Sequence, residues 1–95
     1  MYWSNGSTGA GAVVWDVNVS SLATGAAPGA GTTGSVTATA STTQYLVVAS
    51  SPTTVFTVGD GVPFRLRVNR DADNGADTVA NDAYFLGVLL TRVVL

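Results

Sequence analysis

Two segments of this chain alternate between apolar and polar side chains, and this period of two constrains the fold more than any other feature of the sequence. Within residues 12–22 the alternation is clear from residue 13 to residue 20, where one face carries only Val and Trp15 and the other carries mainly polar residues such as Asp16 and Asn18. Residues 64–69 repeat the pattern, with Phe, Leu and Val on one face and Arg, Arg and Asn on the other. Successive side chains of a strand point to opposite faces of a sheet, so both segments are predicted to be half-buried β-strands. We expect Trp15 to anchor the core.

Five further segments have the composition of short strands, and turn residues separate them. They cover residues 2–4, 36–43, 44–50, 55–58 and 83–95. The longest connection, a Gly/Ala-rich loop between residues 23 and 35, is expected to be mobile or draped on a neighbour. No segment shows the period of an amphipathic helix. The prediction is a single domain over residues 1–95, an all-β, antiparallel, jelly-roll-like β-sandwich of six to seven short strands with no significant helix.

The last predicted strand, residues 83–95, is apolar on both of its faces. Such a strand belongs in the middle of a sheet, where its own core covers one face and a partner covers the other. One face carries Tyr84, Leu86, Val88, Leu90 and Val94, and is interrupted by Arg92. The face predicted to lie in an oligomer interface carries Phe85, Leu89, Val93 and Leu95.

The composition also favours association. Only 11% of the 95 residues are charged, against about 25% in a typical domain, while 46% are hydrophobic. A chain this short buries only roughly 60–65% of its unfolded surface. Its apolar surface therefore exceeds what one small core can hide, and we expect subunits to cover the remainder.

The charge balance argues against nucleic acid and membrane partners. The net charge is −2 and the sequence has no Lys, so the chain offers no basic stripe for a phosphate backbone or an anionic membrane surface. Its longest apolar run, residues 83–90, is too short to span a bilayer. The first residues do not follow the pattern of a secretion signal.

The chain has no Cys and no His, which removes most of the chemistry of enzymes. Thiol nucleophiles, Ser–His pairs and nearly all zinc, copper and haem ligation are excluded. Paired Asp side chains could serve glycoside hydrolysis, but the sequence has no Glu and no insertion that would form a cleft. We therefore predict no catalytic residue, no cofactor and no enzymatic activity.

An acidic loop follows the predicted strand of residues 64–69, and it has three interpretations. As a calcium loop it has Gly75 where a side-chain oxygen is wanted, Ala76 where the turn glycine belongs and Asp82 in place of a bidentate Glu. As a solvated loop it would simply turn at residues 74–75. The favoured interpretation is a structural ion-pair loop, and no metal site is predicted. Its charged residues would be Arg65, Arg67, Arg70, Asp71, Asp77 and Asp82.

Four motifs together resemble a family of bacteriophage virion proteins. They are G-x-V-V-W-D-V at residues 11–17, F-R-L-R-V-x-R-D-A-D at residues 64–73, A-D-T at residues 76–78 and N-D-A-x-x-L-G-V at residues 81–88, with a Gly/Thr-rich middle. In that family a tail-fibre, head-fibre or capsid-decoration protein ends in a trimeric jelly-roll β-sandwich. The resemblance implies a non-enzymatic structural protein located in the virion, a homotrimer, and contacts with other capsid or tail proteins.

The resemblance also implies roles for single residues. Arg70, Asp71, Asp77, Thr78 and Asp82 would be structural positions of the loop, and Trp15 a core residue. Members of the family usually have more strand sequence before the segment that corresponds to residues 2–4. The resemblance therefore implies either a compact variant or strands supplied by a neighbouring subunit.

The alternative function is a carbohydrate-binding, lectin-like tip that recognises a glycan on a host surface. Such sites need exposed aromatic rings that stack on sugars, beside Asp and Asn side chains that bind hydroxyl groups. Tyr2, Trp3 and Tyr45 are the candidates. The competing interpretation, which we favour, is that all three rings are packed in the protein.

Overall fold

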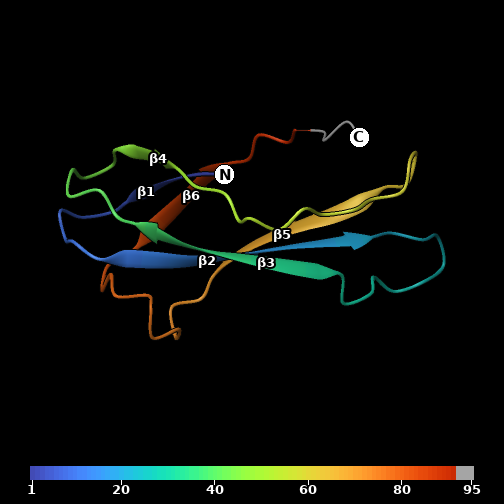
Figure 1. Ribbon diagram of the computed structural model, residues 1–95, viewed down its shortest axis with the longest axis horizontal. Coiled ribbons are helices and arrows are strands. Elements are labelled where there is room, and N and C mark those ends of the chain that lie inside the picture. The colour runs from blue at the N-terminus through green and yellow to red at the C-terminus, as the bar shows by residue number, and fades with distance from the viewer. Residues whose placement is uncertain (92–95) are drawn as a thin grey trace.

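The computed structural model describes residues 1–91, and this part of the chain is all-β, with no helix. Six strands form two three-stranded antiparallel sheets (Figure 1). The first sheet has the order β4 (Val47–Ala49), β1 (Tyr2–Asn5) and β6 (Ala83–Gly87). The second has the order β3 (Thr32–Thr39), β2 (Ala12–Ser21) and β5 (Phe64–Arg70). The predicted all-β class of antiparallel strands is confirmed. A jelly roll has eight strands, so that finer topology stays a prediction.

Strand β2 is the centre of the second sheet, because its backbone pairs with β3 along one edge and with β5 along the other. Its register places Val17 opposite Gly34 of β3 and Val68 of β5. The inner face consists of the Val side chains at odd positions and Trp15, all of them buried. The apolar alternation of residues 12–22 therefore predicted both the strand and its buried face.

Two tryptophans join the sheets. Trp3 of β1 and Trp15 of β2 meet with ring centroids 5.9 Å apart and planes inclined by 60°. The indole Nε1 of Trp3 donates a hydrogen bond to Ser50 Oγ at 3.0 Å, so the ring can be fully buried without losing a polar partner. The other core residues are Met1, Val13, Val17, Ala38, Ala40 and Val79. This tilted pair is the central packing contact between the two sheets.

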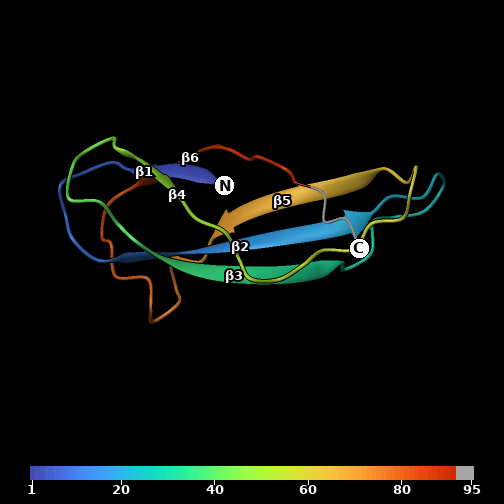
Figure 2. The ribbon, with the colours of Figure 1, turned by 45° about the horizontal axis from the view of Figure 1, so that its top comes forward.

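The chain crosses between the sheets four times, and three of these crossings meet at one end of the molecule (Figure 2). They are residues 6–11, 40–46 and 71–82. Backbone hydrogen bonds tie them together: Gly6 N donates to Asp82 O, Ala40 N to Gly11 O and Tyr45 N to Asn5 O. Because hydrogen bonds run between all three crossings and the strands they connect, this end holds the sheets at a fixed separation.

The loop that joins β2 to β3 is fastened at its end nearest β3. Asn18 Nδ2 donates to Ala30 O and Thr33 Oγ1, each at 2.9 Å, and Ser20 Oγ donates to Gly29 O at 3.2 Å. Both side chains are buried although they are polar. The loop that we expected to be mobile or draped on a neighbour is thus exposed but held to β2 by two side chains.

Several expected strands differ from the observed ones. Only residues 47–49 of the expected strand at 44–50 pair with a neighbour, and residues 55–58 belong to no strand. The central position predicted for the last strand was wrong, because β6 ends at Gly87 and lies at the edge of the first sheet. The apolar side chains of β6 are therefore not covered on both faces, and Phe85 is 45% exposed. Val93 and Leu95 lie outside the described residues.

The tryptophan pair predicts where stability resides. Trp3→Ala should lower the free energy of unfolding by about 3–5 kcal/mol, because it removes a large buried ring and leaves a cavity against Trp15. Tyr2→Ala, one residue away on the opposite face of β1, should cost about 1 kcal/mol or less. Urea unfolding of the two variants measures the difference. Equal losses would contradict the assignment of Trp3 as the joint between the sheets.

Candidate functional site

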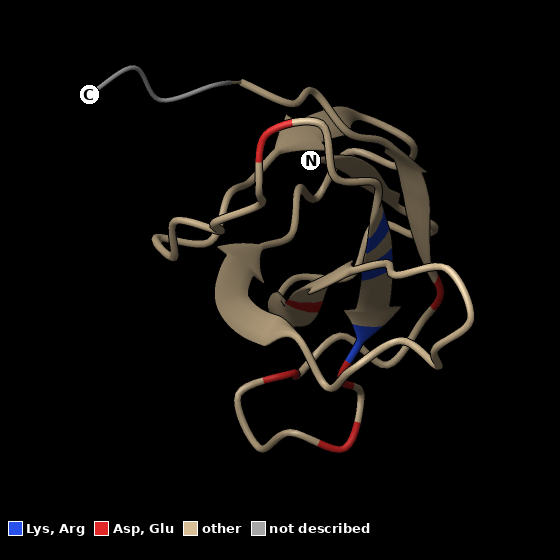
Figure 3. Cartoon of the chain, turned by 90° about the vertical axis from the view of Figure 1, so that its right-hand side faces the viewer, with Lys and Arg blue, Asp and Glu red and all other residues tan. Residues whose placement is uncertain are grey.

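A bidentate ion pair between Arg70 and Asp77 dominates the polar chemistry of the described chain. Arg70 is the last residue of β5, and Asp77 lies in the acidic loop that follows. Figure 3 shows the basic residues on a strand and acidic residues on the loop at its end. Arg70 Nε donates to Asp77 Oδ2 at 3.0 Å and Arg70 Nη2 donates to Oδ1 at 2.6 Å. The side chain of Asp77 is only 1% exposed and that of Arg70 is 18% exposed. Two parallel charge-assisted hydrogen bonds in a shielded site are a strong and directional contact.

Both partners also bind the backbone. Arg70 donates two further hydrogen bonds, to Val79 O at 2.6 Å and to Asn81 O at 2.7 Å. Asp77 Oδ2 accepts a hydrogen bond from the amide of Val14 at 3.0 Å. The pair therefore links three parts of the chain: the end of β5, the acidic loop and the first half of β2.

The acidic loop completes the edge of β2 where β5 no longer reaches. Pairing between β2 and β5 begins at Trp15 and Arg70, so residues 12–14 have no strand beside them on this side. The amide of Ala12 donates to Thr78 Oγ1 at 3.0 Å, and Thr78 N donates to Ala12 O at 2.8 Å. Together with the bond from Val14 to Asp77, these contacts satisfy the backbone polar groups that would otherwise be left unpaired.

Gly11 makes this close approach possible. Its φ angle is +137°, in the region that favours glycine. A Cβ atom on Gly11 would lie 2.8 Å from Thr78 Oγ1. The glycine, the aspartate and the threonine of the motifs at residues 11–17 and 76–78 are thus parts of one contact.

The ion pair shifts the pKa of both groups. Hydrogen bonds from Arg70 lower the pKa of the Asp77 carboxyl below its usual range, the amide of Val14 lowers it further, and burial opposes the shift. The hydrogen bond to Asp77 raises the pKa of Arg70. The ion pair therefore favours the charged forms of both groups.

The predicted pairing of Arg65 and Arg67 with carboxylates of this loop is not seen within residues 1–91, where the pair of Arg70 and Asp77 is the only salt bridge. The reason is the alternation of β5. Arg65 and Arg67 lie opposite Ser20 and Asn18 on the outer face of the second sheet, away from Arg70. Of the other two predicted loop carboxylates, Asp71 meets β2 through its backbone amide, which donates to Val14 O, and Asp82 accepts from Gly6 N through its backbone carbonyl. In the described part of the chain, no three acidic side chains gather as a set that could hold a metal ion.

The aromatic candidates for sugar stacking are separated by the fold. Trp3 is completely buried, as the favoured interpretation of packed rings expects, so its ring is not available to stack on a sugar. Tyr2 is 37% exposed and Tyr45 is 60% exposed. The ring of Tyr45 lies against Tyr84, with centroids 6.1 Å apart, so this aromatic surface includes a residue of β6 that the sequence interpretation did not assign to it.

Apolar side chains gather on the outer face of the first sheet. Tyr2, Val47 and Tyr84 lie opposite to the buried face of Trp3 according to the strand register. We call them, with the neighbouring exposed residues Tyr45 and Leu86, the first-sheet apolar surface. Phe85 is 45% exposed but pairs with Trp3 and therefore lies on the other face of the sheet, and Leu89, beyond the end of β6, is 66% exposed.

Comparisons with known proteins found no match, so the function of this chain must be inferred from the geometry described above. No protein-family model, no curated protein and no solved structure matches the chain. Within residues 1–91 no helix is long and apolar enough to cross a membrane. The two features with functional content are therefore the ion pair that fastens the acidic loop and the exposed apolar side chains around the first sheet.

The fork geometry of Arg70 is testable by a conservative substitution. Arg70→Lys keeps the charge but cannot make two parallel bonds to Asp77 while also reaching two carbonyls. We expect it to lower the free energy of unfolding by roughly 1–3 kcal/mol. Arg67→Lys, on the exposed face of the same strand, should change it by about 0.5 kcal/mol at most. Urea unfolding decides the matter, and an Arg70 variant as stable as the Arg67 variant would show that the fork is dispensable.

The lowered pKa of Asp77 predicts a specific loss of stability in acid. Since the folded pKa is below the unfolded value of about 3.9, the contribution of the carboxylate is complete above that value and disappears as the pH falls through the folded pKa. Asp77→Asn should be less stable at neutral pH and should lose less stability between about pH 5 and pH 2. The exposed Asp73→Asn should follow the wild-type curve. The measurement is urea unfolding across this pH range, and an unchanged slope for Asp77→Asn would refute the role of the pair.

Proposed function

We propose that this chain is a non-enzymatic structural protein of a bacteriophage virion, a trimeric β-sandwich module that decorates a capsid or forms part of a tail or head fibre. The observation that carries the structural part of the proposal is the exposed apolar area around the first sheet. The virion setting and the number three are taken from the resemblance of the four motifs. The partners would be two further copies of the chain and other capsid or tail proteins.

The exposed side chains support association because of their kind and their grouping. Single exposed apolar residues are ordinary, but a contiguous group that includes Tyr and Leu side chains is typical of interaction surfaces. Phe85 and Leu89, which the sequence analysis placed in an oligomer interface, are exposed as well, but Phe85 pairs with Trp3 and so lies on the other face of the first sheet. Permanent assemblies of this kind commonly bury more than about 2,000 Å².

The polar residues support a structural role in a different way. Asp77 and Arg70 bind one another and the backbone, so neither is free to act on a substrate. The chain contains no His, Cys or Glu that could take a catalytic role in their place. What the charged groups do is hold a long loop against β2, as a module that must keep its shape in a particle requires.

A second candidate, recognition of a host glycan, is supported by one observation. Tyr45 and Tyr84 form an exposed pair of rings, and sugars stack on such rings. The same rings lie in the first-sheet apolar surface, so subunit burial and sugar binding compete for them. We favour burial, because the aliphatic neighbours Val47 and Leu86 offer nothing to hydroxyl groups.

The mass of the complex in solution tests the proposal. At low micromolar concentration the wild-type chain should have the mass of three copies. Val47→Asp places a charge in the first-sheet apolar surface and should shift the mass to that of one folded chain. Thr42→Asp, in the exposed connection just before β4, should leave the trimer intact. Sedimentation equilibrium measures all three.

Two results would count against the proposal. A folded wild-type monomer at that concentration would remove subunit burial, and a glycan that bound this monomer through Tyr45 would favour the second candidate. A trimer that is insensitive to Val47→Asp would keep the assembly but place its interface elsewhere.

A further inference from the structure

The sequence contains two Asn-Gly steps, at residues 5–6 and 74–75. Asparagine is one of the thermolabile residues of proteins, because the backbone amide of the next residue can attack its side-chain carboxamide. Glycine favours this attack, since it has no Cβ that would shield its nitrogen and it restricts the backbone least. The two steps have the same composition, so the fold decides which of them reacts.

Both steps form the same local turn. The Oδ1 atom of Asn5 accepts a hydrogen bond from the amide of Ser7 at 3.3 Å, and that of Asn74 accepts one from the amide of Ala76 at 2.9 Å. Such a bond closes a ring that contains the glycine amide, so it folds the carboxamide back over the attacking group. It would also stabilise the negative oxygen that forms during the attack. Local geometry therefore does not separate the two sites.

The step at residues 74–75 is open to solvent. It lies in the first half of the acidic loop, and Asn74 and Gly75 are both exposed. Within residues 1–91, the amide of Gly75 donates no hydrogen bond to the backbone. A Cβ atom placed on Gly75 would meet no other atom within 4 Å. The loop therefore leaves the attacking amide unoccupied and gives it space to turn toward the carboxamide.

The step at residues 5–6 is restrained at the corresponding atoms. Asn5 lies in β1 and is fully buried. Its Nδ2, the atom that would leave as ammonia, donates to Gly9 O at 2.9 Å and to Ser41 O at 3.2 Å. The amide of Gly6, which would attack, donates to Asp82 O at 2.9 Å. Both the attacking and the leaving nitrogen are thus occupied, so reaction at Asn5 requires the strand to open first.

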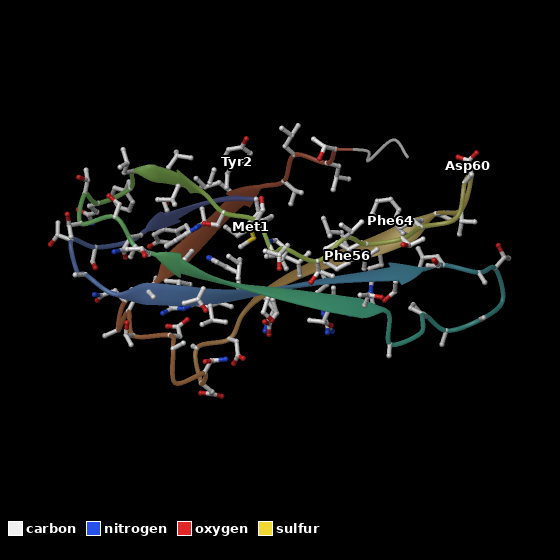
Figure 4. All side chains as sticks on the ribbon, viewed as in Figure 1. Met1, Tyr2, Phe56, Asp60 and Phe64 are labelled. Carbon is white, nitrogen blue, oxygen red and sulfur yellow. The ribbon has the colours of Figure 1, made fainter. Side chains whose placement is uncertain are left out.

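The sequence has one Asp-Gly step, Asp60-Gly61, which could close the same ring. A carboxylate is a weaker electrophile than a carboxamide, so this step reacts more slowly. Asp60 also stands at the opposite end of the molecule from the acidic loop (Figure 4). A change at Asp60 would therefore leave the ion-pair loop untouched.

We propose that Asn74 is a site of spontaneous deamidation in the folded chain and that the fold protects Asn5. The nitrogen of Gly75 forms a bond to Cγ of Asn74, the bond from Cγ to Nδ2 breaks, and the proton of the attacking amide leaves with Nδ2 as ammonia. Water then opens the resulting succinimide. Opening at Cγ gives Asp, and opening at the main-chain carbonyl carbon gives isoaspartate. Water is the only co-reactant, and nothing is oxidised or reduced.

The isoaspartyl product alters the loop that positions Asp77. In the unmodified chain, Asn74 O accepts a hydrogen bond from the amide of Asp77 at 2.9 Å. In isoaspartate this oxygen belongs to a new carboxylate outside the main chain, and the main chain gains one methylene group before Gly75. The turn between Asn74 and Asp77 must then be rebuilt. We therefore expect modification of Asn74 to weaken the contact between Asp77 and Arg70.

The first test follows both asparagines in the full chain. The chain is incubated at mildly alkaline pH and digested with trypsin, and mass spectrometry of the peptides with residues 1–65 and 71–92 locates each replacement of NH2 by OH. In the folded chain Asn74 should react at least about tenfold faster than Asn5, because an exposed loop opens at far lower free energy than a strand. In concentrated urea the two rates should converge, since both residues precede glycine.

Gly75→Ala is the matched variant. Its added Cβ fits the folded loop without a contact, so the variant should keep the wild-type urea midpoint. The same Cβ crowds the attacking nitrogen and should slow the modification of Asn74 by about tenfold. Gly29→Ala adds a Cβ that also meets no atom within 4 Å, and it should leave the rate at Asn74 unchanged.

The stability of the aged protein tests the effect on the loop. After equal incubation, the wild-type chain should have a lower urea midpoint, whereas Gly75→Ala should keep its own. Fresh Asn74→Asp carries the new charge without the additional methylene group, and its midpoint should stay close to that of the fresh wild type. This comparison separates the change in the main chain from the change in charge.

Three results would overturn the proposal. Asn74 could stay unmodified in the folded chain, Asn5 could react as fast as Asn74 there, or Gly75→Ala could leave the rate at Asn74 unchanged. An aged wild-type chain that carries isoaspartate at position 74 and keeps the midpoint of the fresh chain would refute the effect on the ion pair. The peptide masses report covalent changes, so these outcomes are distinct from a failure of the proposed trimer.

Discussion

The first sheet is too short to cover the whole apolar face of the second sheet, and the rest of this structure depends on that constraint. A Val-rich chain of 95 residues folds into two small sheets, and the second sheet is longer than the first. The tryptophan pair closes the sandwich over half of the second sheet, where Trp3 is fully buried against Trp15. Over the other half Phe64 is 38% exposed, and on the outer face of the first sheet the apolar side chains of Tyr2, Val47 and Tyr84 are exposed. Burying such exposed apolar side chains against another subunit is more favourable than leaving them in water.

The acidic loop covers an open strand edge at the end of the sandwich that the tryptophan pair closes. Because β5 pairs with β2 only from Trp15 onward, the first residues of β2 would have an open edge. Asp77 and Thr78 accept hydrogen bonds from the amides of this edge, and Arg70 holds Asp77 in place. A carboxylate that is 1% exposed is tolerated there because its charge is paired and its oxygens have several donors. The loop is thus a substitute for the missing length of β5.

The parts of this fold that could be predicted from the sequence are those in which neighbouring residues form a recognisable pattern. The alternation around Trp15 predicted β2 and its buried face, and the alternation of β5 predicted that Arg65 and Arg67 face away from the core. Proximity of Arg70 to the acidic loop suggested an ion pair. The partner could be narrowed no further than three carboxylates, because the choice of Asp77 depends on where the loop meets Val14. Such a contact links residues 63 positions apart in the chain.

The misassignments arose where strand pairing, and not local pattern, decides the outcome. Residues 55–58 alternate like a strand, yet no neighbour pairs with them. β6 is apolar on both faces, which suggested a central strand, but it lies at an edge with its apolar face unburied. Trp3 stands in a segment too short to show a period, so its complete burial could not be distinguished from exposure. In each case the missing information is the identity of the neighbour across the sheet.

The radius of gyration in solution tests the central claim most directly. One chain alone has a Cα radius of gyration of 14.9 Å. If the exposed apolar side chains of the first sheet are covered by further copies, small-angle X-ray scattering at micromolar concentration should give a clearly larger radius, with forward scattering that corresponds to three chains. A radius near that of the single chain, with the forward scattering of one copy, would contradict the account.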